Sequence, residues 1–417
     1  MTAQPDPSRT DLGQASPEQS GTTADAQGEN PTGTTLPLDG VLVADFSRVL
    51  AGPLATMTLA DLGARVIKVE RPGAGDDTRS WGPPWSDTGA TYFESANRNK
   101  ESVALDLTDP EDLALAKKLA LKADVLVENF KPGGLAKLGL GYEDLRDENP
   151  GLIYASISGF GSAGGRNLAG YDFLVQAVGG LMSITGPADG SPYKTGVALV
   201  DVLCAKDTTI GVLSALEARR RNNGRGSHLE INLLSSLQGA LVNQGQAYLG
   251  AGKVPSRMGN DHPSIVPYQL LQCSDGPLAV TIGNDGQFAR MAGALGVPDL
   301  AKDERFATNS ARVAHREILV PLLEEALSGD TAQHWEDVLT DAGLPAGKVG
   351  GIDDGVALAE DLGLEPTVDV QDASGQTVGR QFRHPVTWNP PLESPTTAPP
   401  QLGEHTESVI EWLKGTS

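Results

Sequence analysis

The sequence has 417 residues, of which 39% are hydrophobic and 21% charged, an ordinary globular composition. The formal net charge of −22 argues against nucleic acid and membrane surfaces as partners, although a local basic cluster can still hold a small anion. The two cysteines, Cys204 and Cys273, exclude a disulfide framework and indicate the cytoplasm. We find no apolar run near the ~20 residues of a membrane span and no signal-peptide pattern.

Residues 1–36 are poor in aromatic residues and rich in Pro, Gly, Ser, Thr and Gln, so we expect a disordered N-terminal tail. The chain after the tail alternates apolar strand patterns with helical ones. Such alternation predicts an α/β fold with a parallel sheet covered by helices on both faces. The predicted strands are 41–46, 65–70, 102–107, 124–130 and 152–158, and the predicted helices begin near Pro53, Pro110 and Glu143.

The second half of the sequence predicts different elements. A long helix with a polar end is expected over 201–226, followed by a strand and a helix over 227–250. A hairpin is expected around Ser274-Asp275-Gly276, followed by short helices such as 316–329. We therefore expect a large domain whose first part is 37–225, and a smaller α+β domain over 226–345.

The strand at 152–158 runs into the glycine series Gly159-Phe-Gly161-Ser-Ala-Gly164. A dinucleotide fingerprint requires a helix that opens at the third glycine and an acidic residue about 20 positions later. The next helix pattern begins only near Tyr171, so the series more simply predicts a tight loop after a strand. An NAD-dependent oxidoreductase stays open as an alternative.

That loop leads to Asp172 at the start of an apolar helix. One interpretation is that Asp172 caps this helix. The other is that Asp172 is a carboxylate nucleophile, held near backbone N–H groups and able to form a covalent acyl intermediate. Residue spacing does not separate the two interpretations.

Other chemistries find less support in the sequence. The six histidines are scattered without a ligand pattern, so no metal site is expected. No phosphate-binding Walker loop and no G-x-S-x-G elbow is found. By contrast, basic residues in the polar loops "IKVERPGAGDDTRSWGPPW" and "ANRNK" lie next to predicted strands, where phosphates are commonly held.

Several segments together resemble the family III CoA-transferases, the relatives of formyl-CoA transferase, carnitine CoA-transferase and α-methylacyl-CoA racemase. The resemblance runs in order from about Leu38 to the end and is strongest to the succinate–hydroxymethylglutarate (glutarate) subgroup. The segments that carry it are "DFSRVLAGPLATMTLADLGARVIKVERPGAGDDTRSWGPPW", "NRNK", "DVLVENFKPGGLAKLGLGYEDL", "YASISGFG", "GYDFLVQAVGGLMSITG", "GVALVDVL" and "HPSIVPYQ".

The resemblance implies a Rossmann-like large domain built from both chain ends, to which residues 346–417 return, and a small domain between them. It also implies an interlocked homodimer. Asp172 would be the nucleophile. The residues implied to contact CoA are Arg48, Val49, Leu50, Ala51, Arg71, Asn97, Arg98 and Lys131, and those implied to lie at the substrate loop are Tyr171, Gly259, Asn260 and His262.

The implied activity moves CoA from an acyl-CoA, with succinyl-CoA the expected donor, to a carboxylic acid. The CoA thioester would be a substrate, and no permanently bound cofactor is expected. Racemases of this family carry a histidine where this chain has Tyr171, with a second aspartate where it has Asp201. Because a phenol is a poor base at neutral pH, acyl-CoA epimerisation is the weaker alternative.

Overall fold

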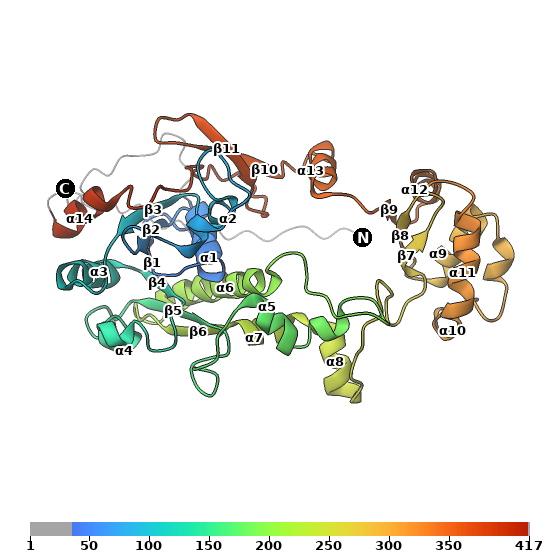
Figure 1. Ribbon diagram of the computed structural model, residues 1–417, viewed down its shortest axis with the longest axis horizontal. Helices are drawn as coiled ribbons and strands as arrows, with labels where there is room; N and C mark the ends of the chain where they lie inside the picture. Colours follow the sequence, from blue (N-terminus) through green and yellow to red (C-terminus); the bar gives the residue numbers. More distant parts are fainter. Residues whose placement is uncertain (1–35, 416–417) are drawn as a thin grey trace, which may run out of the picture. The chain divides into compact units, whose positions relative to one another are not determined.

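Figure 1 shows the computed structural model, which describes residues 36–415. The tail expected over 1–36 therefore lies outside the described residues, apart from Leu36. The main sheet has six parallel strands in the order β3-β2-β1-β4-β5-β6. This is the order of a doubly wound Rossmann-type sheet, and it confirms the predicted α/β class. Its strands are β1 (Leu42–Asp45), β2 (Arg65–Glu70), β3 (Lys100–Ala104), β4 (Val125–Glu128), β5 (Ile153–Ser158) and β6 (His228–Asn232).

Helices cover both faces of this sheet because the central strands β1 and β4 carry apolar residues on both sides. Val43 and Val127 point into one core, which includes residues of α1 (Ala51–Asp61), α6 (Leu199–Arg221) and α7 (Leu233–Ala240). Their neighbours Ala44 and Leu126 point into the other core, with residues of α3 (Pro110–Lys122) and α14 (Thr406–Lys414). The two-residue period of the strands thus explains the two cores.

The bounds of one predicted strand differ from the structure. Strand β3 spans Lys100–Ala104 rather than 102–107, because its backbone pairs with β2 from Val66↔Lys100 to Glu70↔Ala104. The buried Lys100 ammonium lies 3.1 Å from the Asp45 carboxylate. A charged residue in a strand is accommodated when it has such a partner. The helix that begins at Asp172, α5 (Asp172–Val178), ends before Gly179-Gly180, where Gly180 takes a positive φ of 102°.

The sheet continues past residue 225, where the sequence placed the end of the large domain's first part. Strand β6 pairs in parallel with β5, so this segment belongs to the main sheet. The sequence predicts a strand here but assigns it to the small domain. As an edge strand with a polar face, β6 lacks the apolar run that marks a central strand.

A second body has its own core, centred on residues such as Phe288 and Leu323. Its antiparallel sheet has the order β7-β8-β9, and the predicted hairpin joins β7 to β8. Its main elements are β7 (Tyr268–Gln272), β8 (Pro277–Thr281), α9 (Asp285–Ala294), α11 (Arg316–Leu327), α12 (Ala332–Asp341) and β9 (Ala346–Lys348). This is the α+β arrangement expected from the sequence.

After β9 come α13 (Ile352–Asp361) and the hairpin of β10 (Thr367–Gln371) and β11 (Thr377–Phe382). The chain then runs along the edge strand β3, where the His405 N–H donates to the Ser102 carbonyl over 2.9 Å. Among residues 36–415 no helix is long and apolar enough to cross a membrane. The remaining elements are η1 (Asp77–Ser80), α2 (Thr91–Glu94), η2 (Ala136–Leu138), α4 (Tyr142–Leu145), η3 (Met182–Ile184), α8 (Val242–Ala251), η4 (Pro298–Ala301) and α10 (Asn309–Ala314).

Candidate active site

The strand order changes direction between β1 and β4, where ligands bind in open α/β sheets. The loops that leave these two strands are joined by Asn129. Its side-chain amide accepts from the Arg48 N–H over 2.9 Å and donates to the Arg48 carbonyl over 2.7 Å. The loop after β1 is therefore fixed at the expected ligand position.

A cavity of about 270 Å³ opens at this point. It joins the loop after β1, the loop after β4 and the glycine-rich loop after β5. Its lining includes more than half of the site residues that the sequence singled out, namely Arg48, Val49, Leu50, Ala51, Lys131, Tyr171 and Asp172. Residues from distant parts of the chain thus meet at one site.

The glycine series after β5 explains how Asp172 reaches the cavity. A Cβ on Gly159 would lie 2.2 Å from the Gly170 Cα, a distance that no side chain tolerates. The two glycines therefore let the ends of the loop over 159–170 touch, directly before Asp172. The predicted tight loop is confirmed, and the series follows β5 rather than β1, where a dinucleotide fingerprint would stand.

Asp172 does not cap its own helix, so the capping interpretation is wrong for α5. Its Oδ1 instead accepts from the N–H groups of Val200 and Asp201, at 2.8 and 3.4 Å. These belong to the first turn of α6, whose N-cap residue Ala198 has no side-chain oxygen to offer. The positive end of a 23-residue helix thus faces the Asp172 carboxylate.

Gln176 holds the other carboxylate oxygen. Its Nε2 donates to Asp172 Oδ2 over 2.7 Å. The Thr195 N–H donates to Gln176 Oε1 over 3.0 Å, which orients the amide so that its NH₂ group faces Asp172. Because Gln176 is fully buried, this orientation is fixed by packing as well.

Asp201 places a second carboxyl group at the same cavity. Burial raises the pKa of Asp201 to about 7, and the neighbouring Asp172 adds to the rise. A like charge close by disfavours ionisation of the second group. The cavity therefore contains two carboxyl groups in different environments.

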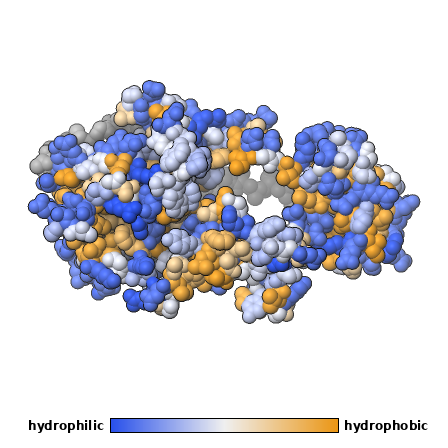
Figure 2. Space-filling view, in the orientation of Figure 1, coloured by the Kyte–Doolittle hydropathy of each residue, from blue (hydrophilic) through white to orange (hydrophobic). Residues whose placement is uncertain are grey.

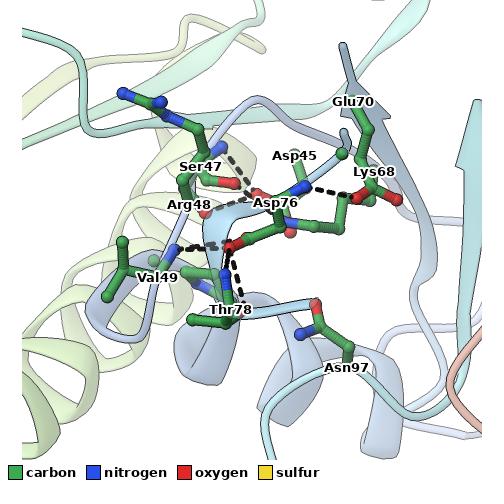
Figure 3. Close-up of polar contacts among 12 residues, drawn as sticks. Asp45, Ser47, Arg48, Val49, Lys68, Glu70, Asp76, Thr78 and Asn97 are labelled. Atoms are coloured by element: carbon green, nitrogen blue, oxygen red, sulfur yellow. Dashed lines mark hydrogen bonds and ion pairs between the residues drawn. The ribbon is translucent and has the colours of Figure 1, made fainter. Parts of the chain in front are cut away.

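A buried ionic network lies beneath the loop after β1, and Figure 3 shows its contacts around Asp76. Lys68 Nζ lies 2.9 Å from Asp76 Oδ2, with both side chains fully buried. Burial alone would raise the pKa of Asp45, but Lys100 and Lys68 outweigh it and lower that pKa to about 2. Burial lowers the pKa of Lys100 to about 8, against the attraction of Asp45. These buried charged side chains hold the segments below the cavity in fixed positions.

A neighbouring cavity of about 340 Å³ borders Arg48 and Arg71 at the ends of β2 and β3. Arg48 lies 3.3 Å from Asp77, and its guanidinium lies over the Phe130 ring at 5.5 Å from the ring centre. Arg71 also pairs with Asp77 and donates to the Gly75 carbonyl over 3.1 Å. Both arginines remain partly exposed, so they are available to an anion.

Two of the residues expected to contact CoA line neither of these two cavities. Arg98 forms a buried, two-pronged ion pair with Asp61, at 2.9 and 2.6 Å. Asn97 is fully buried, donates to the Phe93 carbonyl and accepts from Lys100. The structure gives both residues internal partners instead of a place beside Asp172.

The segment with Gly259, Asn260 and His262 lies after α8, and within the described chain none of the three lines the cavity of Asp172. The His262 N–H donates to the Tyr268 carbonyl over 3.1 Å, and the His262 carbonyl accepts from Arg316 over 2.5 Å. These contacts hold the segment at the start of the second body.

Sequence reasoning missed Asn129 and Gln176. Gln176 stands four residues after Asp172 in a helical pattern. Residues at i and i+4 are neighbours on a helix surface, so this spacing indicates the contact between the two side chains. Asn129 contacts a loop 81 positions away, and no local pattern reveals such a pairing.

Comparisons with known proteins agree with this geometry. A sequence model of CoA-transferase family III matches residues 38–406. Succinate–glutarate CoA-transferase of Agrobacterium fabrum is 43% identical over 389 residues, covering 91% of this chain and 96% of that protein. Succinyl-CoA:glutarate CoA-transferase of Homo sapiens is 41% identical over 378 residues, covering 90% and 85%.

Among solved structures, a CAIB/BAIF family protein from Brucella suis superposes with a TM-score of 0.82 at 44% identity. The match covers 91% of this chain and all of that one. The sequence match and the shared fold both extend over the main sheet and the second body. The chain therefore belongs to CoA-transferase family III.

Proposed function

We propose that this protein transfers CoA from succinyl-CoA to a second carboxylic acid, and that the acceptor is a dicarboxylate. The names of the Agrobacterium and human relatives support this substrate class. CoA enters as a substrate, and the reaction requires no permanently bound cofactor.

The observation that carries the proposal is the position of Asp172. Its carboxylate accepts hydrogen bonds on both oxygens, from Val200 on Oδ1 and from Gln176 on Oδ2, and it borders the same cavity as the loop after β1. A nucleophile needs to be held in one orientation with a reaction space in front of it. Asp172 meets both conditions.

In the proposed reaction the Asp172 carboxylate attacks the thioester carbonyl of succinyl-CoA. The C–S bond breaks, which gives a succinyl-aspartyl anhydride and CoA thiolate. The thiolate attacks the aspartyl carbonyl, releases succinate and leaves an aspartyl-CoA thioester. The acceptor carboxylate repeats these two steps in reverse, so a new acyl-CoA leaves and the Asp172 carboxylate is regenerated.

CoA would lie along the loop after β1 and the basic residues around it. The residues proposed to hold it are Arg48, Val49, Leu50, Ala51, Arg71 and Lys131. Cationic side chains suit the phosphates of CoA. Ala51, the first residue of α1, lines the cavity, and its N–H lacks a partner within the helix, so it suits the oxyanion of the attacked carbonyl.

We further propose that the protein works as an interlocked homodimer in the cytoplasm. Exposed apolar side chains on α5 and directly before it support a partner surface, because Tyr171, Phe173 and Val178 are 68%, 58% and 61% exposed. Figure 2 shows hydrophobic residues gathered over α5. A second subunit would cover them and bring its own loops to the site. Within the described chain both cysteines are free and buried, which suits a reducing compartment.

The experiment is an acceptor panel. The protein is incubated with succinyl-CoA and one carboxylic acid at a time, among them glutarate, malate, itaconate and hydroxymethylglutarate, and the product thioesters are separated by chromatography. A new acyl-CoA that depends on the acceptor and is lost in Asp172→Ala supports the proposal. Exchange of the α-hydrogen of an acyl-CoA in D₂O without transfer would instead favour epimerisation, for which Tyr171 offers no suitable base.

A further inference from the structure

Val49 has a left-handed backbone, with φ at 73°. Glycine reaches this region freely, but a β-branched side chain is crowded there. A strained residue persists only where its surroundings force the conformation, and such residues gather at functional sites. Val49 borders the cavity of Asp172. The groups that hold Val49 in this conformation therefore affect the shape of the site.

Two side chains hold the backbone at this point. Asn129 bonds both the N–H and the carbonyl of Arg48, as described above. Asp76 then accepts from the Val49 N–H with both carboxylate oxygens, at 3.3 and 3.2 Å. Figure 3 shows the Asp76 side chain pointing at the Val49 nitrogen. The Arg48 N–H, the Arg48 carbonyl and the Val49 N–H are thus all hydrogen-bonded by side chains that lie outside the loop.

Asp76 is itself fixed from the opposite side. It is 1% exposed, and its Oδ2 lies 2.9 Å from the buried Lys68 ammonium. Its Oδ1 also accepts from the N–H and hydroxyl of Thr78, at 3.0 and 2.8 Å. A carboxylate with this many partners cannot turn away from Val49 without leaving buried polar groups unpaired.

The conformation of Val49 sets the direction of the residues that follow. Leu50 and Ala51 come next, and α1 begins at Ala51. The Leu50 side chain is apolar and caps none of the first N–H groups of the helix. Ala51, which lines the cavity, therefore depends on the loop for its position.

We propose that Asp76 is a positioning residue, which holds Val49 in the left-handed conformation and so presents the Arg48–Ala51 loop to the CoA thioester. The inference rests on the proposed function, in which this loop holds CoA. Asp76 is buried, with 1% of its surface exposed. It acts through the backbone of Val49.

A double-mutant cycle tests this role, with CoA itself as the probe and equilibrium binding as the readout. Asp76→Asn removes the charge, and Val49→Gly removes the need to force a left-handed valine. We expect Asp76→Asn to raise the Kd for CoA about tenfold or more in the native background, but by less than about threefold in the Val49→Gly background. Leu50→Gly is the matched control, because Leu50 has a φ of −137° and glycine relieves no strain there.

An equal loss of affinity in the native, Val49→Gly and Leu50→Gly backgrounds would overturn the proposal, since a purely structural Asp76 would not distinguish them. Melting temperatures are measured for all variants. If Asp76→Asn does not fold because Lys68 loses its partner, the pair Asp76→Asn/Lys68→Met replaces it in the same cycle. Because CoA binding needs no turnover, the cycle remains readable even if the acceptor panel finds no transferase activity.

Discussion

Gln176 Nε2 donates a 2.7 Å hydrogen bond to Oδ2 of Asp172, while the Thr195 N–H holds the other end of the same amide. The nucleophile proposed here is thus oriented by a buried neutral side chain one helical turn away. This contact leads to the first prediction.

Gln176→Glu is expected to lower kcat by about 10- to 100-fold. The change replaces a donor by an acceptor that repels the Asp172 carboxylate, and a hydrogen bond to a charged group is worth ~1.5–3 kcal/mol. Steady-state kinetics with succinyl-CoA measure the effect. Gln246→Glu, the same change at an exposed position on α8, is the control. A Gln176→Glu protein with native kcat would show that the bond does not orient the nucleophile.

Gly159→Ala is expected to disable the site, whereas Gly164→Ala is tolerated. A methyl group on Gly159 would meet the Gly170 backbone at 2.2 Å, but one on Gly164 would meet nothing within 4 Å. Separation of the two loop ends displaces Asp172, and a misplacement of about 1 Å costs on the order of 100-fold in rate. The measurement is kcat/KM for both variants, with circular dichroism to verify folding. Similar activity of the two variants would refute the role of the glycine contact.

Arg71 and Arg98 are expected to respond in opposite ways. Arg71→Ala should raise the Kd for CoA about tenfold with little change in melting temperature, because its side chain is 53% exposed beside the cavity. Arg98→Met should leave the Kd within about twofold and lower the unfolding free energy by about 3 kcal/mol, because it breaks a buried ion pair with Asp61. Calorimetric titration and urea unfolding measure the two effects. If instead Arg98→Met raised the Kd for CoA and Arg71→Ala lowered the unfolding free energy, Arg98 would be the residue that contacts CoA.

Asp201 gives a prediction about pH. Its pKa rises from 3.8 to about 7 on folding, so the folded protein binds this proton more tightly than the unfolded chain. The native protein therefore loses stability relative to Asp201→Asn as the pH rises from about 4 to about 7, and the difference is constant above that. At pH 8 we expect Asp201→Asn to be more stable by about 2–4 kcal/mol.

Urea unfolding at a series of pH values measures this difference. Asp207→Asn removes a carboxylate from an exposed position on the same helix and is the control for charge loss. The same pH slope in the native and Asp201→Asn proteins would contradict the prediction.

The sequence predicted the parts of this molecule that depend on local pattern. Strands such as β2 and β5 were found because apolar residues mark them, and the tight loop before Asp172 was found because glycines mark it. The resemblance to CoA-transferase family III is confirmed by the comparisons. It also named Asp172 and the Arg48–Ala51 loop, which the structure brings to one cavity.

The rest depends on pairings across long separations, which local patterns do not contain. Arg98 looked like a phosphate ligand because it lies in a polar loop, yet its partner Asp61 lies 37 positions away. Asp172 looked like a cap for its own helix, yet it bonds the start of α6, 28 positions away. The place of β6 in the main sheet was missed for the same reason, because an edge strand is recognised by its neighbour β5.

The most direct measurement for the whole account is mass spectrometry of the peptide that contains Asp172, taken from enzyme treated with hydroxylamine during turnover of succinyl-CoA. The account predicts a hydroxamate on Asp172, formed from the anhydride or thioester, which also appears in Asp201→Asn but not in the inactive Asp172→Ala. An unmodified peptide from actively turning enzyme, together with native kcat in Asp172→Ala, would contradict it.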